Sequence, residues 1–176
     1  MTEKDIFKLI DSWDNFELIL LEMNTNTKML PALMKVAIYN EHPNSWRALY
    51  LADKLHDKHP EEVAIYIPEM IERLKVEQHH GKKRHMLKLI SMNKITDDHS
   101  GFLMDYCFNT LTSSKEPVAN RVHAMQILYN ISENEPDIKP EILELIQHEI
   151  KLHPTPGVRS RGTKLVRKLQ QQISKK

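Results

Sequence analysis

The sequence predicts an all-α protein, an α-solenoid built from about four two-helix repeats. Three observations lead to this fold class: a helix-favouring composition, helical spacing of the apolar residues, and a sequence period near 37 residues. The chain has 176 residues, of which 40% are hydrophobic and 28% are charged, so it can bury the core of one ordinary domain. Only four residues are glycine, and the abundant residues Leu, Ile, Lys, Glu and Met favour helices. We expect a single domain over residues 1–176.

Prolines separate the segments that have helical spacing. Proline disfavours a helical conformation in the preceding residue but is tolerated in a first helical turn. Between these breaks, apolar residues recur at i, i+3, i+4 and i+7, which is typical of amphipathic helices. The expected helices span residues 26–40, 44–58, 61–75, 80–93, 99–112, 117–133, 138–151 and 156–174. Residues 1–24 are expected to form an N-terminal helical cap, as one helix over 3–23 or as two helices broken near Asp14 and Asn15.

Two interleaved registers indicate repeats. In the second helix of each pair, a step of 38 residues from Ser45 leads to Lys83, Arg121 and Arg159. In the first helix, Pro31, Pro68, Met104 and Pro140 are spaced 37, 36 and 36 residues apart. The columns three, six, seven and ten residues after Ser45 and its equivalents are almost entirely apolar or small: Ala48, Met86, Ala124, Gly162; Leu51, Leu89, Ile127, Leu165; Ala52, Ile90, Leu128, Val166; Leu55, Asn93, Ile131, Leu169. The registers predict stacked repeats over about 26–58, 61–93, 99–133 and 138–175, with close helix approach at Ala48, Ala124 and Gly162.

These units resemble HEAT repeats. The first HEAT helix carries a proline near its start, as in Leu30-Pro31-Ala32 and Ile67-Pro68-Glu69, and the second opens with Val-Arg and small residues, as in Val158-Arg159-Ser160-Arg161-Gly162. Asn120-Arg121-Val122-His123-Ala124 is similar. The resemblance covers residues 26–175 and implies a right-handed α–α superhelix whose second helices line the concave side. We expect Arg121 and Arg159 to be structural and to bridge neighbouring repeats.

Charge is distributed unevenly along the chain. Residues 1–80 carry 9 Lys/Arg against 14 Asp/Glu, whereas residues 81–176 carry 16 against 10. If the second helices line the concave side, that side is basic, because those helices together carry a net +11, whereas the first helices over residues 61–75, 97–112 and 138–151 together carry −6. A basic groove attracts an anionic partner through its long-range field.

Helical geometry predicts which side chains of the second helices face this groove. They lie opposite the apolar columns, and the sequence there combines Trp, Tyr and Arg, the composition typical of binding hot spots. Asp53 and Asp57 are expected on the same side. The expected partner-binding residues are Trp46, Tyr50, Arg84, Lys88, Gln126, Tyr129, Lys164 and Arg167.

The function favoured by these features is a non-catalytic scaffold that binds an acidic protein or peptide on the basic concave face. One alternative is nucleic-acid binding. The groove residues also resemble the active site of HEAT-like DNA glycosylases that remove alkylated bases, and this resemblance implies Trp46, Asp53 and Arg84 as the active-site residues. The interleaved acids Asp53, Asp57 and Glu133 weaken this alternative, because polyanion binding favours an uninterrupted basic stripe. A third alternative is a dimerisation or structural role in which the end repeats form the contact, and the oligomeric state stays open.

Other chemistry has little support in the sequence. Five histidines cluster without a zinc-ligand spacing, so we expect no metal: His56, His59, His79, His80 and His85. We also expect no cofactor, because no phosphate-cradling glycine loop or catalytic motif occurs. Cys107 falls on a core face and is expected to be inert. The N-terminus is too charged for a signal peptide and no apolar run suits a membrane span, which predicts a cytoplasmic protein without a membrane partner.

Overall fold

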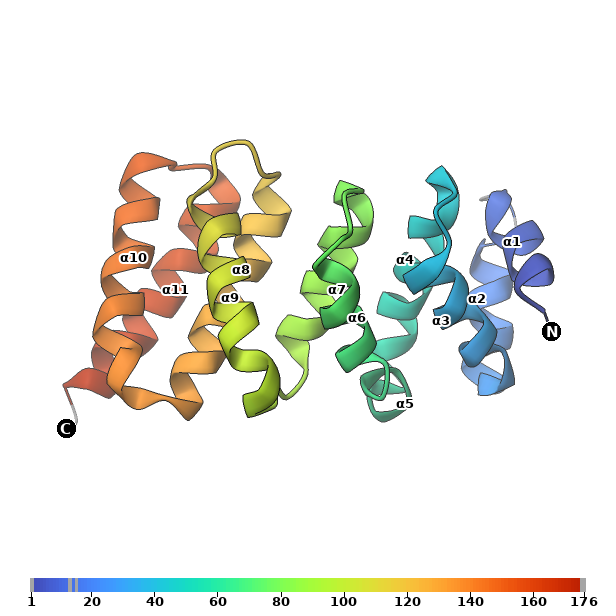
Figure 1. Cartoon of the computed structure of the whole chain (residues 1–176), viewed down its shortest axis with the longest axis horizontal. Helices are drawn as coiled ribbons and strands as arrows, with labels where there is room; N and C mark the ends of the chain where they lie inside the picture. Colours follow the sequence, from blue (N-terminus) through green and yellow to red (C-terminus); the bar gives the residue numbers. More distant parts are fainter. Residues whose placement is uncertain (1, 13, 15, 175–176) are drawn as a thin grey trace. The chain divides into compact units, whose positions relative to one another are not determined.

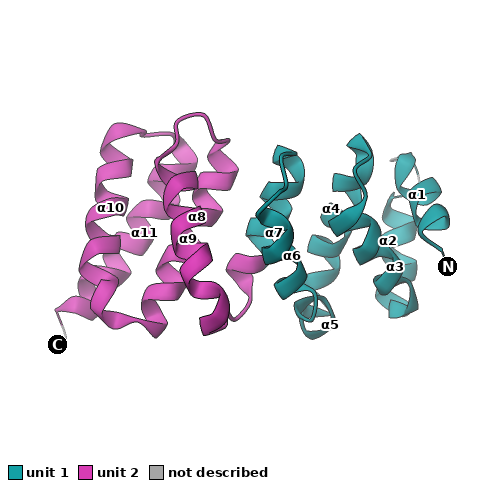
Figure 2. Ribbon diagram, viewed as in Figure 1, with its two compact units in different colours: residues 1–89 teal, residues 90–176 magenta. Residues whose placement is uncertain are grey.

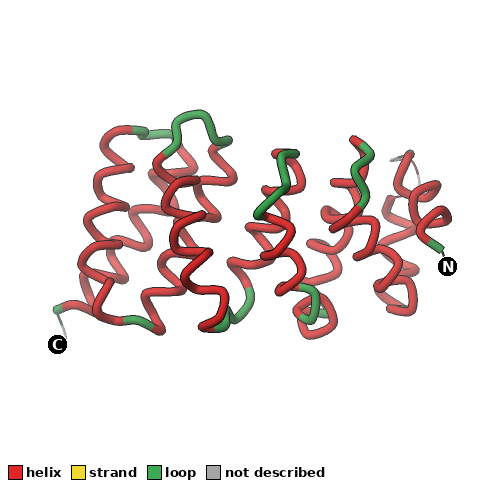
Figure 3. Tube along the Cα trace, viewed as in Figure 1, coloured by secondary structure: helices red, strands yellow, loops and turns green. Residues whose placement is uncertain are grey.

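The computed structural model describes residues 2–12, 14 and 16–174 (Figure 1). Among these residues every regular element is a helix, which confirms the all-α class (Figure 3). No described helix is both long enough and apolar enough to cross a membrane. The α-helices are α1 (Glu3–Asp11), α2 (Phe16–Thr25), α3 (Leu30–Tyr39), α4 (Trp46–His56), α5 (Pro60–Ala64), α6 (Ile67–Leu74), α7 (His80–Met92), α8 (Asp97–Thr112), α9 (Val118–Asn134), α10 (Lys139–Leu152) and α11 (Pro156–Ile173).

The residues cluster into two compact units, residues 1–89 and residues 90–176, with the boundary inside α7 (Figure 2). In unit 1, α3 packs on α4, and α1 and α2 pack on α3 and α4, respectively. In unit 2, α8 packs on α9 and α10 on α11, and α11 also contacts α9. Both units therefore consist of packed helix pairs, as the repeat register predicts. The expectation of a single domain over residues 1–176 stays a prediction.

Helix boundaries follow the prolines closely. Pro31 lies in the first turn of α3, which is preceded by a 3-10 turn at Thr27–Met29. The single helix expected over 61–75 is wrong: it is divided into α5 and α6, with Pro68 in the first turn of α6. A proline ring clashes with the carbonyl four residues earlier, so α5 cannot run on through Pro68.

The N-terminal segment forms two helices, α1 and α2, which is the second of the two arrangements expected. Thr2 and Asp5 begin α1 with a reciprocal capping box, in which each side chain accepts a hydrogen bond from the other residue's backbone N–H. The hydrogen bonds to Asp5 lower the pKa of its carboxyl. Asn15 lies outside the described residues.

The predicted apolar columns form the core. Their members are fully or almost fully buried, except Asn93 and Val166, which are half-buried. Asn93 is the polar member of its column, and Val166 lies on the last helix of the chain. Within unit 1 the buried column residues of the second helices are Ala48, Leu51, Ala52, Leu55, Met86 and Leu89. Within unit 2 they are Ile90, Ala124, Ile127, Leu128, Ile131, Gly162, Leu165 and Leu169.

Gly162 of α11 lies close against Ile146 and Ile150 of α10. A Cβ atom built there would lie 2.7 Å from Ile150 Cδ1 and 2.8 Å from Ile150 Cγ1. Such crowding in a packed core costs about 1–3 kcal/mol, so we expect Gly162→Val to lower the free energy of unfolding by that amount in chemical denaturation. Gly101→Val is the matched control, because a Cβ at Gly101 meets no atom within 4 Å. Equal effects of the two substitutions would contradict this reading of the contact.

Candidate functional site

A cluster of aromatic and basic side chains lies on α4 and α7 of unit 1. Trp46 and Tyr50 are one turn apart on α4, and Arg84 and Lys88 are one turn apart on α7, so each pair shares a helix face. The side chain that joins them is His85. Its ring stacks on Trp46 with a centroid distance of 6.4 Å and meets Tyr50 edge-on at 5.6 Å. We call Trp46, Tyr50, Arg84, His85 and Lys88 the α4/α7 surface.

The two aromatic rings of this surface are held in place. Trp46 and Tyr50 are half-buried, and Tyr50 also packs on Phe16 of α2 with a centroid distance of 5.0 Å. His85 is only 6% exposed and forms the floor beneath both rings. Sequence reasoning singled out His85 only as part of a histidine cluster. Its aromatic role could not be found from spacing within one helix, because its ring contacts lie on α4.

Asp53 is buried, although the sequence placed it on the groove side with Trp46. It is 3% exposed, and Lys88 Nζ lies 2.7 Å from Oδ1 and 2.8 Å from Oδ2, while His85 Nδ1 lies 3.3 Å from Oδ2. Burial raises the pKa of Asp53, but the hydrogen bonds from His85 and Lys88 outweigh burial and hold the pKa below its usual value. The carboxylate is thus an internal counterion, which is a correction to its expected place in a solvent-facing groove.

The positive charge of the α4/α7 surface is only partly compensated by the buried Asp53. Lys88 is 35% exposed in spite of its ion pair with Asp53. Arg84 is exposed, and Lys54 Nζ lies 5.6 Å from the centroid of the Tyr50 ring. A partner that approaches Trp46 and Tyr50 therefore meets cations around two rigid aromatic rings.

The depressed pKa of Asp53 predicts a pH effect on stability. A carboxyl whose pKa is lower in the folded state stabilises the fold above its unfolded value of 3.8, and this contribution is lost as the pH falls through the folded value. We expect wild-type protein to lose stability as the pH falls below about 4, and Asp53→Asn to lose less over the same range. The measurement is urea denaturation at several pH values. A constant difference between the two proteins across that range would contradict the prediction.

In unit 2, two of the expected partner-binding residues connect α9 to α11 instead. Gln126 accepts a hydrogen bond from Arg161 Nη1 at 2.6 Å. Tyr129 is only 7% exposed, its hydroxyl accepts a hydrogen bond from Gln172 at 3.2 Å, and Lys168 Nζ lies 5.5 Å from its ring centroid. The expectation of Tyr129 as an accessible anchor is therefore wrong, because the neighbouring helix α11 covers it.

The remaining residues expected in unit 2, Lys164 and Arg167, are exposed on α11. Of the eight expected residues, Trp46 and Tyr50 contact His85, and Lys88 is linked to His85 through Asp53. Arg84 is exposed one turn before Lys88 on α7. A continuous concave groove that also includes Lys164 and Arg167 stays a prediction.

A second set of cations has a structural role that sequence reasoning found only in part. Near the start of α4, α7 and α9, one cation each donates hydrogen bonds to carbonyls at the C-terminal end of another helix: Arg47 to Ile10 and Asp11, Lys82 to Ile38 and Asn40, and Arg121 to Leu111. The carbonyls at a helix C-terminus have no intrahelical partner and carry partial negative charge. These bonds join α4 to α1, α7 to α3 and α9 to α8 at helix ends.

Arg121 confirms the expected bridge between repeats, because it also pairs with Glu149 of α10 at 2.9 Å. Arg159, of which the same was expected, is exposed, and Arg161 contacts α9 in its place. The sequence analysis did not identify Arg47 and Lys82, because they do not align with Arg121 in the repeat register. The aligned positions are Ser45 and Lys83; Arg47 lies two residues after the first, and Lys82 lies one residue before the second. A search for any cation in the first turn of each second helix, at whatever exact position, would have identified both residues.

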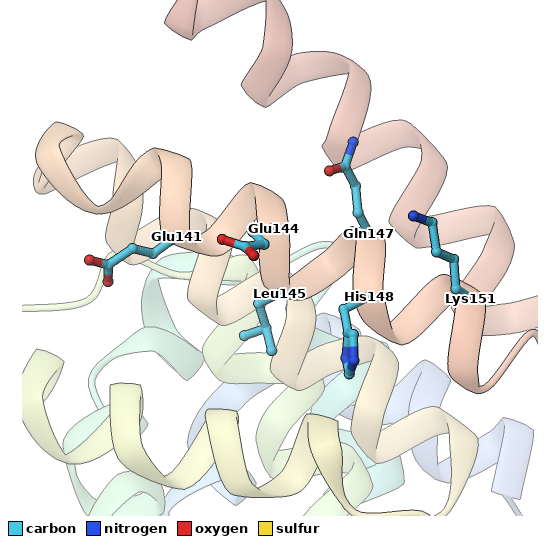
Figure 4. Close-up of a pocket in the computed structure, with 6 residues that line it drawn as sticks. All are labelled: Glu141, Glu144, Leu145, Gln147, His148 and Lys151. Carbon is cyan, nitrogen blue, oxygen red and sulfur yellow. The ribbon is translucent and has the colours of Figure 1, made fainter.

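A shallow hollow of about 620 Å³ lies along α10. Figure 4 shows its side chains spread along the helix. They are Glu141, Glu144, Leu145, Gln147, His148 and Lys151. None of the six is fully buried, and acidic and basic groups are mixed, so we assign no chemistry to it.

Cysteine and metal chemistry also lack a site among the described residues. Cys107 is fully buried, as expected, and burial raises the pKa of its thiol. No group of three or more His, Cys, Asp or Glu side chains in the described part of the chain could hold a metal ion.

Comparison with known proteins identifies the repeat. The sequence profile of a HEAT repeat domain matches residues 11–169. No curated protein matches the chain, and no solved structure matches it.

Proposed function

Since this chain belongs to the HEAT repeat family, we propose that it is a non-catalytic interaction scaffold that binds an acidic protein or peptide segment at the α4/α7 surface. HEAT repeats are generally protein-interaction scaffolds. The observation that carries the proposal is the pair of half-buried rings, Trp46 and Tyr50, which both contact His85 of α7, the residue that follows the exposed Arg84.

The arrangement of the rings favours binding. An aromatic side chain that is already held in one orientation loses little conformational entropy when a partner covers it. Trp46 is stacked on His85, and Tyr50 is held between His85 and Phe16. Tryptophan, tyrosine and arginine together are the residues most enriched in binding hot spots.

The charge around the rings favours an acidic partner. Asp53 is buried, paired with the ammonium of Lys88 and within hydrogen-bond distance of His85, so the carboxylate does not cancel the field of the exposed Arg84. Complementary charges at the rim of an interface speed association and select among partners.

The buried Asp53 lowers the support for base-excision chemistry. A HEAT-like DNA glycosylase that removes alkylated bases needs a carboxylate that reaches the substrate. Asp53 is 3% exposed and engaged by two cationic or hydrogen-bonding side chains. Nucleic-acid binding without that chemistry is therefore an outcome that the test must separate from protein binding.

The test compares Arg84→Glu with wild type in two assays. One is pull-down with quantitative mass spectrometry, followed by titration of the captured protein; the other is fluorescence anisotropy with labelled single- and double-stranded DNA. We expect an acidic protein whose affinity falls at least tenfold in Arg84→Glu. Lys28→Glu is the matched control, because it makes the same charge change at an exposed position away from the α4/α7 surface.

Two outcomes would contradict the proposal. The first is a partner whose affinity is the same for Arg84→Glu and Lys28→Glu. The second is tight DNA binding near physiological salt that falls steeply as salt is raised and is lost in Arg84→Glu/Lys164→Glu, because a steep salt dependence reports phosphate contacts. Circular dichroism of each variant checks that the fold is retained.

A further inference from the structure

The helices α2 and α11 are much less covered than the corresponding helices inside each unit. In unit 1, α4 buries six of its 11 residues, whereas α2 buries only Ile19 and Met23 of its 10. In unit 2, α9 buries nine of its 17 residues, whereas α11 buries four of its 18. Each of these helices therefore presents a broad exposed face to solvent.

The exposed face of α2 is apolar at its centre. Phe16 points towards α4, where it packs on Tyr50. At 100° per residue, Leu18 and Glu22 lie on the opposite side of α2, and Leu21 lies next to them. Leu18 is 66% exposed and Leu21 is 61% exposed. Contiguous apolar side chains on a solvent-facing surface commonly mark an interaction site, so the two exposed leucines, one turn apart, indicate that a partner covers this face.

The corresponding face of α11 combines one cation, Arg159, with two apolar side chains, Val166 and Ile173. Arg161 and Lys168 point towards α9, where they contact Gln126 and Tyr129. The opposite side of α11 carries Arg159, Thr163, Val166, Gln170 and Ile173. Arg159 is exposed, while Val166 and Ile173 are half-buried. No acidic residue occurs between residues 152 and 176.

We propose that copies of this chain associate head to tail, with the α2 face of one copy on the α11 face of the next. Leu18 and Leu21 would pack against Val166, Ile173 and the aliphatic stem of Arg159, since long basic side chains cover apolar surface with their stems. Glu17 and Glu22 flank the two leucines, and in this contact they would lie near Arg159 of the next copy. Such a contact is heterologous, so it joins two different faces and can continue from copy to copy.

Charge selects this contact over a symmetric one. Pairing α2 with α2 would bring Glu17 and Glu22 of two copies together, and pairing α11 with α11 would bring together two helices that carry Lys and Arg but no acidic residue. Like charges placed opposite each other disfavour such pairings, whereas α2 on α11 is complementary. The contact uses none of the α4/α7 surface, so this proposal and the proposed function can fail independently.

Two variants test the contact by blocking one face each. Leu18→Lys blocks the α2 face and leaves α11 intact, whereas Arg159→Glu/Gln170→Glu blocks the α11 face and leaves α2 intact. All three substituted positions are exposed, so the variants are expected to fold, which circular dichroism checks. The measurement is sedimentation velocity over a range of concentration, with one variant carrying a tag that makes the masses distinguishable.

We expect wild type to form dimers and longer assemblies as concentration rises, and each variant alone to remain monomeric. An equal mixture of the two variants is expected to form a one-to-one dimer and nothing larger, because only one compatible pair of faces is left. Wild type that stays monomeric at millimolar concentration would overturn the proposal. So would self-association of either variant alone, since it would mean a symmetric contact or another face.

Discussion

Replacing Arg121 with alanine is expected to lower the free energy of unfolding by about 3–5 kcal/mol, because it leaves a buried charge without its partner. Arg121 is 3% exposed and Glu149 is 2% exposed, and Arg121 Nη2 lies 2.9 Å from Glu149 Oε2. The substitution also removes the donor to the carbonyl of Leu111 at 2.8 Å. Chemical denaturation of the variant and of wild type measures the difference.

Arg159→Ala is the matched control for this experiment. Arg159 stands 38 residues after Arg121 in the repeat register but is exposed, and substitutions at exposed sites usually change stability by less than about 0.5 kcal/mol. A second variant, Arg121→Met/Glu149→Leu, removes both charges, and we expect it to recover much of the lost stability. Similar losses in Arg121→Ala and Arg159→Ala would show that the buried pair contributes little.

The fold could be predicted from the sequence because its determinants are local. Amphipathic spacing fixes which residues of a helix point inward, and proline fixes where helices begin. Both signals act within one or two turns, so the columns that include Ala48 and Ala124 identified buried positions correctly. The division between α5 and α6 was missed, although Pro68 marks it.

The candidate site could be predicted only in part because its contacts join different helices. A helical wheel identifies the side opposite the core, but it does not show which flank a neighbouring helix covers. Tyr129 is therefore buried by α11, and Asp53 is buried by side chains of α7. Trp46 and Tyr50 were identified correctly as a pair on one face, but the ring beneath them, His85, comes from another helix.

Replacing Glu77 with alanine is the second substitution expected to have a large effect, again about 3–5 kcal/mol. Glu77 is 6% exposed and accepts hydrogen bonds from the backbone N–H groups of Gln78 and His79 at 3.0 and 2.9 Å. Its other carboxylate oxygen lies 3.1 Å from Nζ of Lys82, which is 2% exposed. The variant would leave the Lys82 ammonium buried with only carbonyl oxygens as partners.

Glu72→Ala is the control, because Glu72 is exposed and its bond to Lys75 is a surface pair. Such a pair contributes about 0–1 kcal/mol, although its oxygens lie as close as 2.7 Å to the Lys75 ammonium. Thermal or chemical denaturation of both variants shows whether the loss of stability depends on the burial of the ion pair or on the distance between its charged atoms. A loss in Glu77→Ala no larger than in Glu72→Ala would mean that the buried cluster does not stabilise unit 1.

Raising the pH tests whether the loss in a Glu77 variant comes from the charge of Lys82. Burial lowers the pKa of Lys82 from its usual 10.5, and Glu77 opposes this shift. In Glu77→Gln the opposing carboxylate is gone, so the pKa of Lys82 falls further. A group with a lower pKa in the folded state binds fewer protons there, and stability then rises with pH. We expect the stability difference between Glu77→Gln and wild type to shrink as the pH approaches 10.5, whereas a purely steric loss would not change with pH.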